Sequence, residues 1–114
     1  MFTYHNEEVL SFNFDESAVL GLEWVNEYKD LHVKLDWADE RDLAPDCCPT
    51  LAFDFVTELE AQFAFPKMTM GSMQIGTIEF VPLENRTWSV AIQFYFQPVG
   101  HIRFNCTNIK FTHN

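Results

Sequence analysis

Apolar and polar side chains alternate along the stretch from Trp88 to Cys106. The apolar members keep one parity on either side of an interruption: Trp88, Val90, Ile92, Phe94 and Phe96 before it, and Ile102, Phe104 and Cys106 after it. A period of two is typical of a strand that buries one face. The interruption at residues 97–100 contains Pro98 and Gly100, which favour a turn. The stretch therefore predicts a β-hairpin.

The same period predicts strands over most of the remaining chain. We expect them at residues 8–14, 18–26, 31–37, 51–65 and 75–83, with a short last strand after Cys106. The pattern at residues 8–14 fits an ordered lead-in equally well. A shift of parity at Thr107 and Asn108 is expected to place Ile109 and Phe111 in the core, as a bulge or tight turn does. Most of these segments are separated by short polar connections, which favours a meander of hairpins.

Residues 18–37 predict a second hairpin. Leu20, Leu22 and Trp24 share one face of the first strand, and Gly21 between them predicts a bulge or a close backbone approach. Residues 27–30 form a polar four-residue connection, which is a common hairpin loop. In the later strand at residues 75–83, Ile78 and Phe80 are expected to point inward, and Pro82 indicates an edge or a strand end.

Residues 51–65 allow two interpretations. Residues 58–62 are good helix formers, which favours a helix from about residue 55 to residue 63. However, Leu59, Ala61, Phe63 and Phe65 share a parity with Leu51, and a helix would scatter these side chains around its axis. We therefore expect a long or bent strand.

The composition agrees with a β-rich domain. Twelve phenylalanines and three tryptophans among 114 residues favour pleated, half-buried surfaces. The length fits a single domain spanning residues 1–114. We predict an all-β, antiparallel sandwich or open barrel of seven or eight strands joined by meander-like hairpins.

The negative charge of the chain is concentrated in its first half. Residues 1–60 hold 15 acidic and 3 basic side chains, a balance of −12, whereas residues 61–114 hold 2 and 4, a balance of +2. The total of −10 repels a phosphate backbone, so we expect no nucleic-acid partner. The chain has no apolar run of bilayer length, and its first residues lack the pattern of a signal peptide. We therefore expect a cytoplasmic protein that does not bind membranes.

The sequence shows no arrangement typical of catalysis or metal binding. His5, His32, His101 and His113 are dispersed, and His32 and His101 have the parity of solvent-facing strand residues. The three cysteines are odd in number, and the acidic neighbours of Cys47 and Cys48 disfavour a thiolate, so we expect reduced, unreactive thiols. We predict no enzyme activity, no cofactor and no metal.

The segment from residue 39 to residue 50 lacks apolar periodicity and predicts a long acidic loop. Its charge allows two interpretations. Net charge keeps a Phe-rich β protein soluble, but the same carboxylates can also steer a basic protein partner. The candidate partner-binding residues are Asp36, Asp39, Glu40, Asp42 and Asp46. Trp24 and Trp37 lie near this loop in the predicted hairpin and would serve as anchors if exposed, although core positions are expected.

Two segments resemble the small β-rich immunity proteins of bacterial polymorphic toxin systems. They are FDESAVLGL at residues 14–22, a turn leading into a strand, and GHIRFNCTNIKF at residues 100–111. The resemblance implies a cytosolic inhibitor without catalytic residues that binds a cognate toxin. Many such toxins are basic nucleases, which agrees with the acidic chain.

Three functions follow from these observations. The first is a non-enzymatic binding protein, an immunity-type inhibitor that binds a basic toxin through an acidic surface. The second is a small barrel whose phenylalanines line a cavity for an apolar ligand. The third is a structural module that forms homo-oligomers, such as a homodimer, through an edge strand.

Overall fold

The computed structural model describes residues 2–36, 49–65, 72–96 and 98–113. These residues form nine strands in one antiparallel sheet: β1 (Phe2–His5), β2 (Ala18–Val25), β3 (Asp30–Asp36), β4 (Thr50–Asp54), β5 (Thr57–Ala64), β6 (Gln74–Pro82), β7 (Trp88–Tyr95), β8 (Val99–Cys106) and β9 (Asn108–His113). Two short 3-10 helices, η1 (Asn6–Ser11) and η2 (Glu84–Arg86), connect strands. No helix in these ranges has the length and apolar character needed to cross a membrane.

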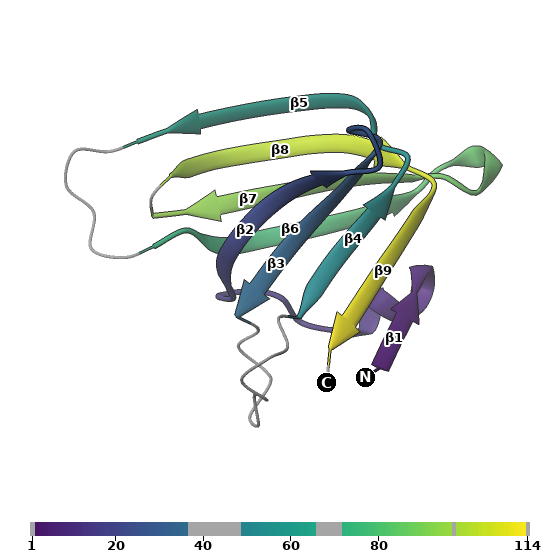
Figure 1. Cartoon of the computed structure of the whole chain (residues 1–114), viewed down its shortest axis with the longest axis horizontal. Coiled ribbons are helices and arrows are strands. Elements are labelled where there is room, and N and C mark those ends of the chain that lie inside the picture. Colours follow the sequence, from purple (N-terminus) through teal and green to yellow (C-terminus); the bar gives the residue numbers. More distant parts are fainter. Residues whose placement is uncertain (1, 37–48, 66–71, 97, 114) are drawn as a thin grey trace.

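The sheet folds over on itself into two layers. Its strand order is β1-β9-β4-β3-β2-β6-β7-β8-β5. Figure 1 shows β1, β9, β4, β3 and β2 crossing the direction of β6, β7, β8 and β5, with the chain turning from one layer to the other between β4 and β5 and between β8 and β9. The layers are also joined through β2 and β6, which pair only at Ala18 and Gln74. This architecture confirms the predicted all-β antiparallel fold. Consecutive strands pair as hairpins in β2-β3-β4 and in β6-β7-β8, whereas the other neighbouring strands are distant in the chain.

The core lies between the two layers, and most of its residues have the predicted inward parity. Phe55, Leu59 and Phe65 share that parity along residues 51–65 but are exposed. The hairpin of β7 and β8 contributes Trp88, Val90, Ile92, Phe94, Ile102, Phe104 and Cys106, all buried. The opposite layer contributes Leu31, Val33, Leu35, Leu51, Phe53, Ile109 and Phe111. Full burial of one such side chain contributes roughly 1.5–3 kcal/mol to the free energy of unfolding. The predicted hairpin and the parity shift after Cys106 are both confirmed.

The N-terminal prediction was wrong. Residues 8–14 do not form a strand; η1 occupies residues 6–11, and the first strand, β1, precedes it. Val9 is fully buried while Leu10 is exposed, so this segment is an ordered lead-in and not a strand. The Phe12 amide donates to the Val9 carbonyl at 3.2 Å, so the chain is closed into a tight turn before Phe14 enters the core.

Residues 51–65 form a bent strand, as predicted, and the helical alternative is wrong. β4 and β5 are separated by a corner at Phe55, whose φ of 54° no regular strand has. The Asp30 carboxylate accepts the Phe55 amide at 2.9 Å, and the Lys29 carbonyl accepts the Val56 amide at 2.7 Å. These bonds replace the ladder bonds lost at the bend. Counting both halves of this segment as strands raises the total to nine, above the expected seven or eight.

The predicted bulge in β2 is confirmed. Val19 pairs with Leu35 and Gly21 pairs with Lys34, so Leu20 is the extra residue. Leu20 is 59% exposed, and as the extra residue it does not share one face with Leu22 and Trp24 as expected. The extra residue of a bulge has no partner on the neighbouring strand, so its side chain does not follow the alternation between the two faces of the strand. At the end of β6, Pro82 is the last strand residue, as its missing amide donor predicts.

Candidate partner-binding site

Asp36 is the one predicted partner-binding residue that the structure describes. It ends β3, is exposed, and lies opposite Ala18 at the start of β2. The other four predicted residues lie outside the described residues: Asp39, Glu40, Asp42 and Asp46. Trp37 also lies outside them, and Trp24 is partly buried against the core, so it is not a free anchor.

Two further carboxylates lie at the same end of the molecule. Asp15 and Glu16 are exposed in the turn that leads into β2, two to three residues before the Ala18 that faces Asp36. In the described part of the chain none of the three is within ion-pair distance of a basic side chain. We call Asp15, Glu16 and Asp36 the acidic end. Of these three residues only Asp36 was predicted from the sequence, because Asp15 and Glu16 lie in a separate turn near the start of the chain.

The turn that carries Asp15 and Glu16 is held rigidly. Phe14, on its N-terminal side, is buried, with its ring 4.8 Å from that of Phe111. Ser17, on its C-terminal side, is fully buried and its amide donates to the Phe14 carbonyl at 3.2 Å. The Glu16 amide donates to Ile75 of β6 at 2.8 Å. Burial of both flanking residues therefore forces the two carboxylates outward.

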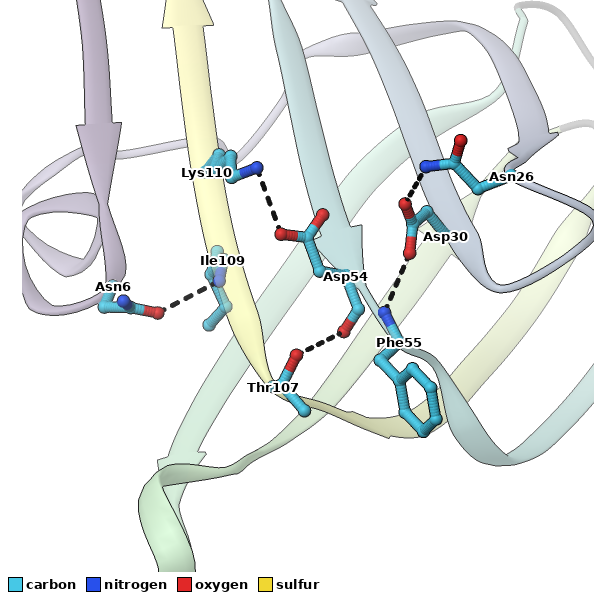
Figure 2. A network of polar contacts seen from close by, with 8 residues as sticks. All are labelled: Asn6, Asn26, Asp30, Asp54, Phe55, Thr107, Ile109 and Lys110. Carbon is cyan, nitrogen blue, oxygen red and sulfur yellow. Dashed lines mark hydrogen bonds and ion pairs between the residues drawn. The ribbon is translucent and has the colours of Figure 1, made fainter.

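Two other carboxylates of the first half form ion pairs within the fold. Glu23 pairs with Lys34 at 2.8 Å, and Asp54 pairs with Lys110 at 3.0 Å. Figure 2 shows the second pair within a network that joins the β4–β5 corner to β9. In that network the Asp54 carbonyl accepts the Thr107 amide at 2.9 Å and the Thr107 hydroxyl at 3.2 Å. These acids are already neutralised and are poor candidates for binding a basic partner.

Asp30 stabilises the β4–β5 corner. Its carboxylate accepts the Phe55 amide at 2.9 Å and also accepts the side-chain amide of Asn26 (Figure 2). The backbone bond from Phe55, followed by the bond from Asn26, lowers the pKa of Asp30 from its ordinary value. A carboxyl with a lowered folded-state pKa stabilises the fold above its unfolded pKa, and this contribution is lost as the pH falls through the folded pKa.

Asp30→Asn is expected to lower the free energy of unfolding at pH 7 by about 1 kcal/mol, because a partly solvated charged acceptor is replaced by a neutral one. The difference from wild type should shrink once the pH falls below about 4, where the unfolded carboxyl becomes protonated. Urea unfolding followed by circular dichroism at pH 7 and pH 3 measures both effects. If Asp30→Asn lowers the free energy of unfolding equally at pH 7 and pH 3, the ionised Asp30 carboxylate does not stabilise the corner.

A second surface lies at the opposite end, where η1 and η2 approach the β8–β9 corner. It consists of two adjoining hollows of about 510 and 370 Å³. Thr87 and Thr107 line both hollows, Glu7 and Arg86 flank the larger one, and Glu58 flanks the smaller one. Sequence analysis missed this surface because its residues come from distant segments. Its charges have mixed sign, so it suits a basic partner less well than the acidic end does.

The described residues offer little for catalysis. They contain no group of three or more His, Cys, Asp or Glu side chains placed to hold a metal ion. Cys106 is buried in the core, and its burial raises its pKa to about 12, so the thiol stays protonated. His32 and His101 are partly exposed on outward strand positions. Cys47 and Cys48 lie outside the described residues.

Comparisons with known proteins add no further constraint. No family model matches the chain, and no match is found among curated proteins or among solved structures. The resemblance to immunity proteins therefore stays a prediction.

Proposed function

We propose that this chain is a non-enzymatic, cytoplasmic binding protein of the immunity type, which inhibits a basic toxin by binding it through the acidic end. The observation that carries the proposal is the set of three exposed carboxylates Asp15, Glu16 and Asp36. In the described part of the chain none of them forms an ion pair with a basic side chain. Four more acidic residues follow Asp36 within the next ten positions of the sequence.

The electrostatics support a basic partner. A total charge of −10 attracts cationic proteins over a distance of about one Debye length, roughly 8 Å at physiological salt. Charges around an interface mainly raise the association rate and select the partner. An inhibitor of this kind needs no catalytic group, because it acts by covering the surface that its toxin uses.

The packing of the interior supports a binding surface more than a ligand cavity. Phe53 and Phe104 come from opposite layers, and their ring centroids lie 4.9 Å apart in an edge-on arrangement. Phe63 and Phe94 lie 5.9 Å apart. Aromatic side chains in mutual contact fill the space that an apolar ligand would need. The apolar-ligand barrel is therefore the weaker alternative.

The proposal is tested by co-expression with the toxin domain encoded beside the gene of this chain. Wild type is expected to restore growth of a bacterial host that expresses the toxin. The triple variant Asp15→Asn, Glu16→Gln and Asp36→Asn is expected to weaken toxin binding by roughly tenfold, or about 1.4 kcal/mol, and to lose protection. The affinity of the wild type, measured by calorimetry, should fall as salt is raised.

A matched triple variant removes the same charge elsewhere. Glu7→Gln, Glu27→Gln and Glu84→Gln act on residues away from the acidic end, and Glu27 lies in the turn at the opposite end of β2 and β3. This variant should protect as well as wild type. If both variants protect equally, the acidic end is not the binding site, and if no adjacent gene encodes a toxin, the immunity function itself is refuted.

A further inference from the structure

β5 is an open edge of the sheet. It ends the strand order and pairs with β8 alone among the described strands, whereas the other edge, β1, has only four residues. Every residue of β5 except Phe63 is exposed. Leu59 is 42% exposed, and Phe65, just beyond the strand, is 71% exposed. An exposed edge strand presents unpaired amide and carbonyl groups that can pair with a further strand.

The regular part of this edge is short and well defined. The register with β8 shifts between Thr57 and Glu60, so the strand is irregular at its start. From Glu60 to Ala64 the pairing is continuous, with Gln62 in the middle. This span contains no proline and no basic side chain, and Glu60 is its one charged residue.

We propose that two copies of this chain associate by antiparallel pairing of their β5 strands about a two-fold axis at Gln62. In this register Gln62 faces its own copy, Ala61 faces Phe63, and Glu60 faces Ala64. All five residues of the regular span then gain a partner, and residues of the same parity stay on the same face of the joined sheet.

The side chains fit this register better than one centred on Glu60. The large Phe63 lies opposite the small Ala61, which suits cross-strand packing. Centring the pair on Glu60 would place two carboxylates directly opposite each other, and like charges in that position are destabilising. Centring it on Gln62 separates the carboxylates and also brings the exposed Leu59 opposite Phe65. The second copy therefore covers the apolar side chains that β5 leaves open.

Disulfide trapping tests the register. Residues directly opposite in an antiparallel pair have Cα atoms about 4.5–5.5 Å apart, within the range of a disulfide. With Cys47 and Cys48 replaced by serine, the buried Cys106 is the remaining native cysteine. Gln62→Cys is expected to yield a covalent dimer on oxidation, whereas Ala64→Cys alone should stay monomeric. Failure of Gln62→Cys to cross-link, or equal cross-linking by Ala64→Cys, would overturn the proposal.

Charge variants at Ala64 test the association without cysteines. Ala64→Lys should strengthen dimerisation severalfold, because the lysine of each copy would form an ion pair with Glu60 of the other copy. Ala64→Glu should weaken dimerisation severalfold, because it places two carboxylates opposite each other. The same two changes at the exposed Thr77 of β6 control for net charge and should have the smaller effect. The measurement is analytical ultracentrifugation of the full chain over a wide concentration range.

Salt dependence separates this association from binding of a basic toxin. Two copies with a net charge of −10 repel each other, so the dimer should strengthen as salt is raised. Binding of a basic toxin at the acidic end should weaken over the same range. A chain that remains monomeric at every concentration and salt level would overturn the dimer and leave the immunity function standing.

Discussion

Phe53→Ala is expected to lower the free energy of unfolding by about 3–5 kcal/mol, the range found for removing a fully buried aromatic ring. Phe53 has no exposed surface, and it lies where β4 of one layer crosses β8 of the other. Its ring packs against Phe104 at 4.9 Å. Because domains are stable by only about 5–15 kcal/mol in total, this variant should approach the limit of folding.

Chemical denaturation monitored by tryptophan fluorescence measures the loss, and two variants act as controls. Phe53→Leu retains most of the apolar volume of the side chain and should lower the free energy of unfolding distinctly less than Phe53→Ala. Phe55→Ala removes the same ring two residues later, where the side chain is 57% exposed, and should cost less than about 1 kcal/mol. Equal losses at positions 53 and 55 would show that the ring of Phe53 does not join the layers.

The strand interiors could be predicted because they obey a local rule. Within β7 and β8 the residues lie on a pleated surface with one buried face, so parity separates core from solvent. Phe96 is an exception, because it has the inward parity but lies beyond the end of β7 and is 41% exposed. The same rule found β3, whose Leu31, Val33 and Leu35 are buried. It also favoured strand over helix at residues 51–65, although the local helix propensity argued otherwise.

The positions of the bends could not be predicted, because long-range contacts determine them. The β4–β5 corner depends on Asp30, which lies 25 residues before Phe55 in the chain. Likewise, the Asn6 side chain accepts the Ile109 amide at 3.0 Å and holds η1 against β9, where a strand was expected (Figure 2). Parity gives no information about such partners. The errors therefore lie at residues 8–14, at the bulged Leu20, and after the corner, where Leu59 and Phe65 are exposed.

The candidate site was predicted only in its general character. The excess of acid in the first half indicated a basic partner, but the sequence does not separate free carboxylates from those used by the fold. Glu23 and Asp54 are each paired with a lysine from another strand, at distances of 2.8 and 3.0 Å. Asp15 and Glu16 become candidates only when the turn before β2 is seen beside the end of β3.

Gly100→Ala is expected to lower the free energy of unfolding by about 3 kcal/mol, as overpacking against a rigid neighbour does. Gly100 lies opposite Phe63 where β5 pairs with β8. A Cβ atom at this position would lie 2.0 Å from the Gln62 carbonyl oxygen and 2.9 Å from the Phe63 Cα. Both atoms belong to the backbone, so the clash can be relieved only by moving β5 away from β8. Thermal or urea unfolding measures the loss, and amide hydrogen exchange should show reduced protection in β5.

Two other glycines provide controls that separate this clash from a general effect of adding a methyl group. At Gly21 nothing lies within 4 Å of the added Cβ, so Gly21→Ala should leave stability unchanged or raise it by up to about 1 kcal/mol. At Gly76 the Cβ would meet the Tyr95 ring at 2.3 Å, but that ring is 45% exposed and can rotate away. The expected order of destabilisation is therefore Gly100, then Gly76, then Gly21. A loss at Gly76 equal to that at Gly100 would show that contact distance, and not the rigidity of the backbone, determines the cost.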